Sequence, residues 1–504
     1  MKRLATSRLN SASAVSVVSA AIALAFSTQT HALQFTWNGG DYLAADRPNP
    51  LGSGDVVNAV AGANKLFTGN VVNNGRFNWL STDSVFFGAS AVLSNNGMFD
   101  FQSNGWLRPG NAGSTLDNAG ILRKSGGIGS LLVDTLLVNR SGATLDASSG
   151  SIYFRASGTL EAGSLFTGAG THVFETVGTY TFNDHFTGVD NNVRLNRGTF
   201  ISGGSERLDP RTNFTWGGGV LQGNWGNSAG RTMTALSGFD KVIAGSLVND
   251  GRINWATADA VYLSGEGSSL RNNGTVDFQA NSWIRPFGAN TVVDNAGILS
   301  KSGGIGSLLI DTPLINTGAI ESLSGNIRLP SNWRNDGTLR GDAAFQTDVL
   351  SNAGDVAPGL PDPAQAIATL SLTGALTQTA AGTLSFDVSS GGLSDIFNVT
   401  GAVSFDGMVH VFHFGDYVAQ LGDTFRVMNF ASFSGGLDGV KEFGFGGGVE
   451  FEALYSPTYL ELRVTAVPEP HGWALMAGGL LLLSRLKWRD RQRRTVNRPC
   501  NPAC

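Results

Sequence analysis

Short runs of alternating apolar and polar residues fill most of this chain, and one fixed pattern recurs among them. The pattern is apolar-x-Asn-x-Gly-x-apolar, as in residues 71–77, and alternation on both sides of a bend predicts two half-buried strands joined by a turn. Within two clusters the copies recur roughly every 20 residues, a spacing that suits one coil of a solenoid. The glycines of nine copies are Gly75, Gly97, Gly120, Gly251, Gly274, Gly297, Gly318, Gly337 and Gly354.

Each Asn-x-Gly is expected to turn the chain at the same corner of every coil, because glycine enters the left-handed region freely and asparagine tolerates it. Stacked coils then bring the asparagines into register, where their amides can hydrogen-bond up the stack. A tenth copy, residues 137–142, carries one inserted residue. We interpret these asparagines as structural. Six of them are Asn73, Asn95, Asn118, Asn249, Asn272 and Asn295.

A longer repeat indicates that a block of coils was duplicated. Residues 116–135 and 293–312 are identical at 17 of 20 positions. A solenoid accepts such an insertion because each coil contacts only its neighbours. The sequence therefore predicts an all-β, right-handed parallel β-helix with a C-terminal capping region. The predicted divisions are a signal peptide (1–32), two β-helix blocks (33–210 and 211–356), a C-terminal region (357–466), a sorting signal (467–494) and a tail (495–504).

The N-terminus has the three parts of a secretory signal peptide. Lys2, Arg3 and Arg8 precede an apolar stretch at 12–26, and small residues flank a cleavage site between Ala32 and Leu33. The mature chain is therefore expected to begin at Leu33.

The C-terminus carries a second targeting signal. Val467-Pro468-Glu469-Pro470 is followed by an apolar run and then by a basic cluster. The run is shorter than the roughly 20 residues of a stable span, so we interpret it as a temporary anchor held with its charges on the cytoplasmic side. The anchor residues are Trp473, Leu475, Leu480, Leu481, Leu482 and Leu483, and the basic residues are Arg485, Lys487, Arg489, Arg491, Arg493 and Arg494.

This order of motif, apolar run and basic cluster resembles the PEP-CTERM sorting signal of Gram-negative bacteria. The resemblance implies that Pro468-Glu469-Pro470 is recognised by an exosortase, a membrane protease-transpeptidase, which would be a processing partner. In the family the basic cluster usually ends the chain, whereas here residues 495–504 follow it. An ordinary C-terminal membrane anchor is the alternative interpretation.

Composition restricts the partners of the exported part. Residues 1–32 and 468–504 contain ten basic and two acidic residues, so 34 basic and 39 acidic residues in the whole chain become 24 and 37, a net charge of −13. An acidic body argues against nucleic acid or an anionic membrane as partner. The two cysteines, Cys500 and Cys504, lie in the tail, so no disulfide can form in the mature protein.

The region from residue 357 differs from the repeats in its sequence pattern. Its Leu-x-Leu-x-Gly, Thr-Gln-x-x-x-Gly-x-Leu and Gly-Asp-x-Phe-x-Val strands, at 370–374, 377–384 and 422–427, resemble the C-terminal part of autotransporter-type passenger β-helices. The upstream coils resemble filamentous haemagglutinin-like adhesins. These resemblances imply a β-helical protein of the cell surface.

Candidate chemistry is sparse. A polysaccharide lyase or glycoside hydrolase needs converging carboxylates, and Asp184, His185 and Asp190 are the candidates between the two blocks. His410 and His413 are three apart in a predicted strand, so they should face opposite sides and share no metal. No cofactor motif is present. Four aromatic residues at Gly+4 are interpreted as an internal stack, with an external sugar platform as the alternative: Trp79, Phe101, Trp255 and Phe278.

These observations predict an exported, non-enzymatic structural or adhesive protein of the cell surface or extracellular matrix, associated with biofilm or exopolysaccharide. Its expected partners are an exosortase, for processing, and exopolysaccharide or cell-surface glycans. A β-helix enzyme acting on extracellular polysaccharide is the alternative.

Substitution of Glu469 tests the sorting prediction. Glu469→Ala is expected to leave unprocessed precursor in the inner membrane, because the carboxylate belongs to the motif that the protease would recognise. Intact-mass measurement of the protein in membrane and surface fractions gives both end points of processing. Normal maturation of the variant would contradict the sorting assignment.

Overall fold

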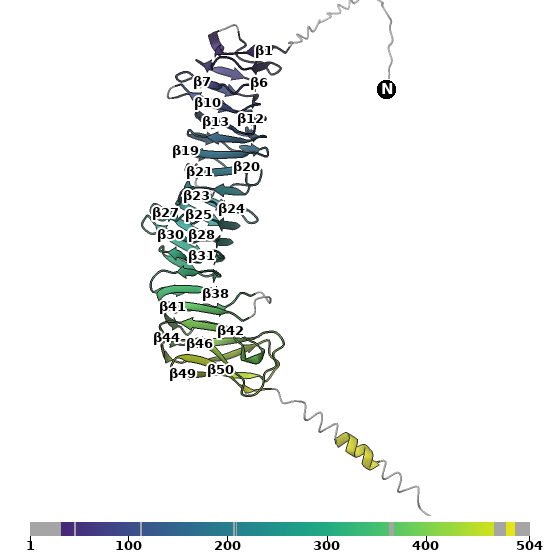
Figure 1. Ribbon diagram of the computed structural model, residues 1–504, viewed down its shortest axis with the longest axis vertical. Helices are drawn as coiled ribbons and strands as arrows, with labels where there is room; N and C mark the ends of the chain where they lie inside the picture. The colour runs from purple at the N-terminus through teal and green to yellow at the C-terminus, as the bar shows by residue number, and fades with distance from the viewer. Residues whose placement is uncertain are drawn as a thin grey trace, which may run out of the picture.

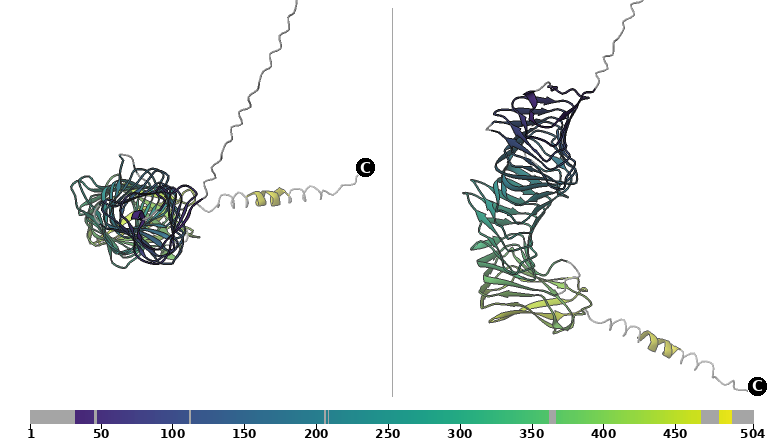
Figure 2. Two further views of the ribbon diagram at one scale, coloured as in Figure 1. Left: turned by 90° about the horizontal axis from the view of Figure 1, so that it is seen from above. Right: turned by 45° about the horizontal axis from the view of Figure 1, so that its top comes forward.

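The computed structural model describes residues 32–44, 47–110, 113–204, 207, 209–361, 367–467 and 480–488. Most of these residues form a long column in which coils of chain are stacked from the N-terminal end to the C-terminal end (Figure 1). Seen along its axis the column is compact, and seen from the side it curves gently (Figure 2).

Three short strands make up each regular coil. One coil consists of β7 (Ser84–Phe87), β8 (Val92–Asn95) and β9 (Met98–Phe101). Each strand pairs in parallel with the equivalent strand of the next coil. The predicted parallel β-solenoid is therefore confirmed. The strands of that next coil are β10 (Gly105–Pro109), β11 (Thr115–Asn118) and β12 (Ile121–Lys124).

Alternating side chains create the core, because every second residue of a strand points into the column. The inward positions of the first coils hold aromatic rings, with Trp79 and Phe101 at 5.7 Å and Phe99 and Phe101 at 4.6 Å between ring centroids. Trp255 and Phe278 are equally enclosed. The internal aromatic stack predicted from the sequence is confirmed, and these four rings do not form an external sugar platform.

A ladder of buried asparagines joins the coils at one corner, as predicted. Asn73 Nδ2 donates to Asn95 Oδ1 at 2.7 Å, and the same 2.7 Å bond links Asn95 to Asn118 and Asn118 to Asn139. The ladder ends where Asn139 Nδ2 donates to Ser164 Oγ at 3.0 Å. Most of these amides also donate to a backbone carbonyl of the next coil, as Asn73 does to Met98 O at 3.0 Å. The asparagines thus satisfy one another inside the column, where unpaired amides would be costly.

The second ladder is longer than the sequence pattern indicates. It runs through the expected Asn249, Asn272 and Asn295 with bonds of 2.7 to 2.8 Å. Asn227 starts it although no glycine follows two residues later, and Asn352 ends it by donating to Gln378 Oε1 at 2.9 Å.

The reason expected for the repeat glycines was wrong. None of the nine has a positive φ, so the corner does not use the left-handed region. Glycine is needed because successive coils approach closely: a Cβ on Gly274 would lie 2.0 Å from Gly251 O, and one on Gly97 would lie 2.1 Å from Gly75 O. The corner therefore requires the absence of a side chain rather than a special backbone conformation.

The duplicated blocks do not have the same orientation around the column. Eight successive parallel pairings lead from β10 to β29 (Thr275–Phe278). The strand that repeats β10 in the second block is β30 (Ser282–Pro286), which follows β29 along the chain. The duplication thus spans eight coils and one strand, and every motif of the second block is moved to the next face of the column.

Two long strands accompany this change. β19 (Thr171–Phe182) and β21 (Val193–Ser202) each cover two faces without a full break, and their pairing contains register shifts between Phe174 and Thr179. Parallel pairing nevertheless continues across both of the predicted boundaries, at 210 and at 356. The two blocks form one uninterrupted stack.

The pairing becomes antiparallel at the C-terminal end. β46 (Thr424–Asn429) pairs in parallel with the preceding coil, but antiparallel with β50 (Tyr459–Ala466), which also pairs with β49 (Glu450–Ser456). The last strands therefore leave the coiled path and fold back across the end of the column.

The two predicted processing sites are partly described. Leu33 is bound to the first coil, where its amide donates to Asp55 Oδ1 at 2.9 Å, and Val467 packs against the core at the other end. Leu480 to Leu483, Arg485 and Lys487 lie on a helix at residues 480–488, and no helix in the described part of the chain is long and apolar enough to cross a membrane. The remaining tail residues lie outside the described residues: Pro468, Glu469, Pro470, Trp473, Leu475, Arg489, Arg491, Arg493 and Arg494.

Removal of one ladder amide tests the corner. Asn272→Ala is expected to destabilise the column by about 3 kcal/mol, because it leaves the buried Oδ1 of Asn295 without its ladder donor and Asn249 Nδ2 without its ladder acceptor. Asn273→Ala, at the exposed neighbouring position, should cost less than about 0.5 kcal/mol. Urea unfolding followed by far-ultraviolet circular dichroism compares the two variants, and equal midpoints would contradict a stabilising ladder.

Candidate functional site

The acidic and histidine residues proposed between the blocks do not converge on one reactive centre. His185 Nδ1 accepts a hydrogen bond from Asp209 N at 2.8 Å, and Asp184 accepts one from the amide of His185. Asp190 instead pairs with Arg231 at 3.3 Å and accepts from Asn213 N at 3.2 Å. Each side chain is therefore engaged in its own local contact.

The two histidines of β45 (Met408–His413) also have separate surroundings. His410 lies against the ring of Phe443 at 5.0 Å between centroids, whereas His413 Nε2 is 2.6 Å from Tyr417 O. Across the described residues, no three His, Cys, Asp or Glu side chains are arranged to hold a metal ion.

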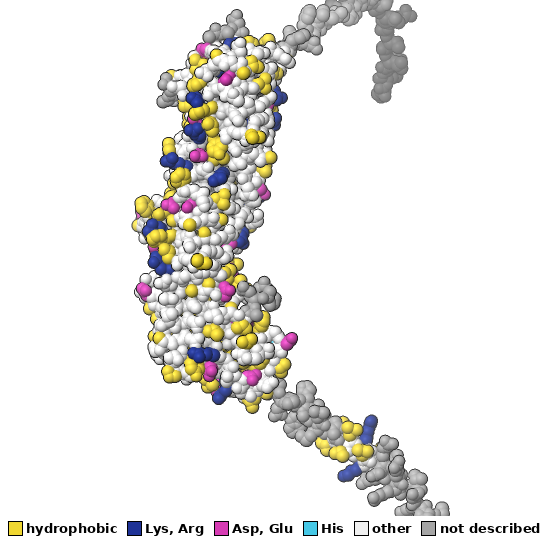
Figure 3. Space-filling view, in the orientation of Figure 1, with side chains coloured by type: hydrophobic (Ala, Val, Ile, Leu, Met, Phe, Trp, Pro, Cys, Tyr) yellow, Lys and Arg dark blue, Asp and Glu magenta, His cyan; other side chains and the backbone are white. Residues whose placement is uncertain are grey.

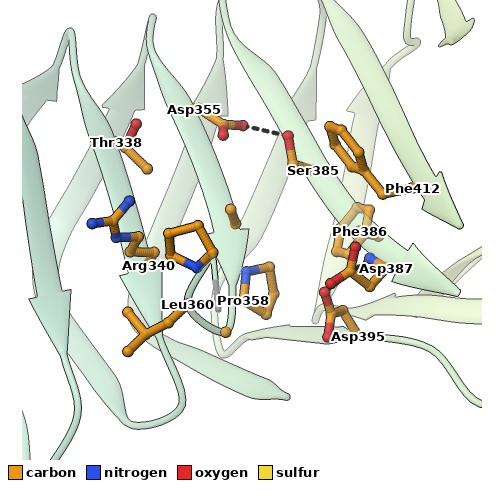
Figure 4. A pocket seen from close by; sticks show the side chains of 13 residues that line it. Thr338, Arg340, Asp355, Pro358, Leu360, Ser385, Phe386, Asp387, Asp395 and Phe412 are labelled. Atoms are coloured by element: carbon orange, nitrogen blue, oxygen red, sulfur yellow. Dashed lines mark hydrogen bonds between the residues drawn. The ribbon is translucent and has the colours of Figure 1, made fainter. Parts of the chain in front are cut away.

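A cavity of about 300 Å³ lies on the outer surface of the column near its C-terminal end (Figure 4). Its floor comes from the outward side chains of three successive strands of one face, β38 (Thr338–Gly341), β40 (Asp355–Pro358) and β42 (Thr383–Val388). Pro358 and Leu360 form part of its wall. The cavity collects three carboxyl groups, Asp355, Asp387 and Asp395.

The carboxyl groups of this cavity are held differently. Asp355 Oδ1 accepts a hydrogen bond from Ser385 Oγ at 2.8 Å, and Asp395 accepts from Ala368 N at 2.7 Å and from Asp387 N at 2.9 Å. Asp387 and Asp395 lie side by side, and Asp355 lies apart from them (Figure 4). Arg340 is neutralised by Glu321, with Nη2 to Oε1 at 2.6 Å.

Burial shifts all three carboxyl groups toward the protonated form. It raises the pKa of Asp355 and the pKa of Asp387, and burial together with the adjacent Asp387 raises the pKa of Asp395 to about 7, although two backbone amides oppose this shift. A carboxylic acid that keeps its proton near neutral pH can act as a general acid. This cavity is therefore the place where a hydrolytic activity would have to be sought.

A second kind of site, which the sequence reasoning missed, occurs twice. In the first block, the guanidinium carbon of Arg108 lies over the indole of Trp106, 3.3 Å from its centroid, and 5.6 Å from the centroid of Phe86 in the preceding coil. Trp106 Nε1 donates to Asp134 Oδ2 at 2.7 Å, and Asp134 also pairs with Arg155 at 3.5 Å. The indole is thus fixed from the next coil.

The second block repeats this arrangement on β30 and its neighbours. Arg285 lies 3.4 Å from the centroid of Trp283 and 5.9 Å from that of Tyr262. Trp283 Nε1 donates to Asp311 Oδ2 at 2.6 Å, and Asp311 pairs with Arg328 at 2.7 Å. We call the two groups the first and second Trp–Arg clusters. Their sequence signal is the outward-facing Trp-x-Arg-Pro of β10 and β30.

Both clusters are at the surface. The Trp and Arg side chains of β10 and β30 are half-buried, because they stand on the outward side of strands whose alternate residues fill the core. Figure 3 shows basic and hydrophobic side chains mixed along the flank of the column near β10 and β13 (Ser130–Val133), and again near β27 (Val261–Leu263) and β30. The clusters therefore offer aromatic and cationic groups together to solvent.

Comparison with known proteins adds a structural likeness. No protein-family model matches the sequence, and no curated protein matches it. Among solved structures, the crystal structure of the Haemophilus influenzae Hap adhesin aligns at 12% identity with a TM-score of 0.24, over 81% of this chain. The alignment spans 64% of the Hap chain. A TM-score of this size does not carry a functional assignment.

The buried carboxyl of Asp395 gives a pH prediction. Its folded-state pKa of about 7 lies above the roughly 3.9 of an unfolded aspartate, so the folded state binds more protons and stability falls as the pH rises from about 4 to about 7. Asp395→Asn should reduce this slope, because the amide does not titrate, while the altered hydrogen bonding lowers the urea midpoint at every pH. Asp416→Asn, at an exposed position, should keep the wild-type slope. An unchanged slope in Asp395→Asn would show that this carboxyl is not the titrating group.

Proposed function

We propose that this chain is an exported, non-enzymatic protein of the bacterial cell surface or extracellular matrix, with a structural or adhesive role. The observation that carries the proposal is the uninterrupted stack of coils between β1 (Gln34–Trp37) and β50. A stiff column presents the same kinds of side chains at many heights, so that weak contacts along it can add to a useful avidity.

The export route is part of the proposal. A signal peptide would be cleaved between Ala32 and Leu33, directly before the first coil, and the tail from Val467 would be processed by an exosortase. The antiparallel β46, β49 and β50 would then cap the free C-terminal end and keep it from pairing with another chain, as unpaired strand edges tend to do. The expected ligands are exopolysaccharide and cell-surface glycans, and no cofactor is expected.

A polysaccharide-cleaving enzyme is the second candidate, and the cavity at Asp355, Asp387 and Asp395 is the observation that favours it. The pKa of Asp395, raised to about 7, would provide an acid near neutral pH. Two of the three carboxylates already accept hydrogen bonds from the protein, which is typical of structural carboxylates. We therefore give the binding role precedence.

A depolymerisation assay separates the two candidates. The full-length chain is mixed with the matrix polysaccharide of the producing bacterium, and we expect it to sediment with the polymer while the polymer keeps its length in size-exclusion chromatography. If the wild-type chain shortens the polymer and the Asp387→Asn variant does not, the function is enzymatic and the binding role is wrong. The exposed Asp416→Asn is the matched control.

A further inference from the structure

We propose that the two Trp–Arg clusters are paired binding sites for the carboxylate groups of an acidic polysaccharide. This inference rests on the proposed binding function and names the residues and the class of ligand. The juxtaposition that motivates it is a guanidinium stacked on an indole, beside a second aromatic ring, at two repeat-related positions.

Neither stacked arginine has an acidic partner within the described residues. Arg108 Nε is buried without a hydrogen-bond partner, and Arg285 Nη1 donates to the neutral Tyr262 Oη at 3.5 Å. Other repeat-related arginines on the surface differ: Arg76 pairs with Asp100 at 3.1 Å and Arg252 with Asp277 at 2.8 Å. The column thus neutralises Arg76 and Arg252 with its own carboxylates and leaves Arg108 and Arg285 without one in the described part of the chain.

The stacking prepares these arginines to bind an anion. A guanidinium held against an indole has already lost much of its side-chain freedom. Because Arg108 Nε is buried, the two Nη groups of Arg108 are the donors that could form a bidentate contact. The indole is itself held by Asp134 in the first cluster and Asp311 in the second, so the platform does not have to form on binding. Preorganisation of this kind lowers the entropic cost of association.

The surroundings favour a carboxylated sugar polymer. The forked N–H groups of arginine match the two oxygens of a carboxylate. Phe86 beside Arg108, and Tyr262 with the exposed Phe287 beside Arg285, offer aromatic surface to the apolar faces of sugar rings. The net charge of −13 opposes every polyanion, so binding of a carboxylated polymer depends on the local arginines and aromatic rings of the clusters. Nucleic acid affinity depends on neutralising many phosphates, which two separate arginines do not supply.

The spacing of the clusters favours a polymer over a small ligand. Eight coils and one strand separate β10 from β30, which corresponds to about 40 Å along the column at ~4.8 Å per coil. The two strands belong to neighbouring faces, so a ligand must extend around the column as well as along it to reach both clusters. One chain that reaches both clusters makes the second contact intramolecular, so its avidity exceeds the affinity of either cluster.

Polygalacturonate binding to immobilised full-length chain tests the proposal. Arg108→Gln and Arg285→Gln should each weaken binding about tenfold, and the double variant should weaken it about a hundredfold or more. Arg108→Lys and Arg285→Lys together keep the charge but lose the flat fork, and binding should still fall. Arg334→Gln is the control, because it removes an exposed arginine that is already paired with Asp336 at 2.7 Å. Its binding affinity should change less than about twofold, since an exposed ion pair contributes little.

Methyl-esterified polygalacturonate and duplex DNA distinguish the ligand chemistry. Loss of binding on esterification supports carboxylate recognition, whereas equal binding of the ester, or tighter arginine-dependent binding of DNA, overturns it. A double variant that binds as well as the wild type, with an unchanged dichroism spectrum, also overturns the inference. In that last case, retained sedimentation with the producer's own matrix polymer would show that the proposed function stands and only the site is wrong.

Discussion

The close stacking of one corner of each coil on the next is the constraint on which the whole column depends. A buried asparagine at that corner accepts from the coil before it and donates to the coil after it, as Asn95 does between Asn73 and Asn118. Two residues later a glycine packs against a backbone carbonyl of its neighbour at a distance that leaves no room for a Cβ. Because each amide is buried and takes its ladder bonds from the adjacent coils, a coil of different register would leave polar groups unpaired in the core.

This constraint divides the chemistry of the molecule between inside and outside. The inward positions take the aromatic and aliphatic side chains, including Trp79 and Phe101, and leave them no contact with a ligand. The outward positions are free to vary, and they hold both the carboxyl-lined cavity near Asp395 and the two Trp–Arg clusters. A parallel solenoid can therefore acquire a surface site by changing alternate residues of two or three adjacent strands, without rebuilding its core.

The sequence predicted the parts of the fold that depend on local periodicity. The parallel solenoid, the register of the asparagines and the buried aromatic residues all follow from spacing and alternation. Gln378 could not be recognised as the end of the second ladder, because it lies outside the Asn-x-Gly pattern and reaches Asn352 only through the stacking of coils. Trp106 and Arg108 could have been noticed as a repeated outward Trp-x-Arg-Pro, but their stacking geometry could not.

The sequence alone determined what each coil is made of: where its strands lie, which residues face inward and which corner carries the asparagine. Only the tertiary structure decided how the two blocks are placed around the axis. One repeat of the block contains eight coils and one further strand. Trp283 therefore lies on the face that holds the first asparagine ladder, and not on the face that holds Trp106. The physical reason lies in the long strands between the blocks, such as β19, which set how many residues each coil there contains. The bend of β19 depends on packing against the adjacent strands and not on a local motif.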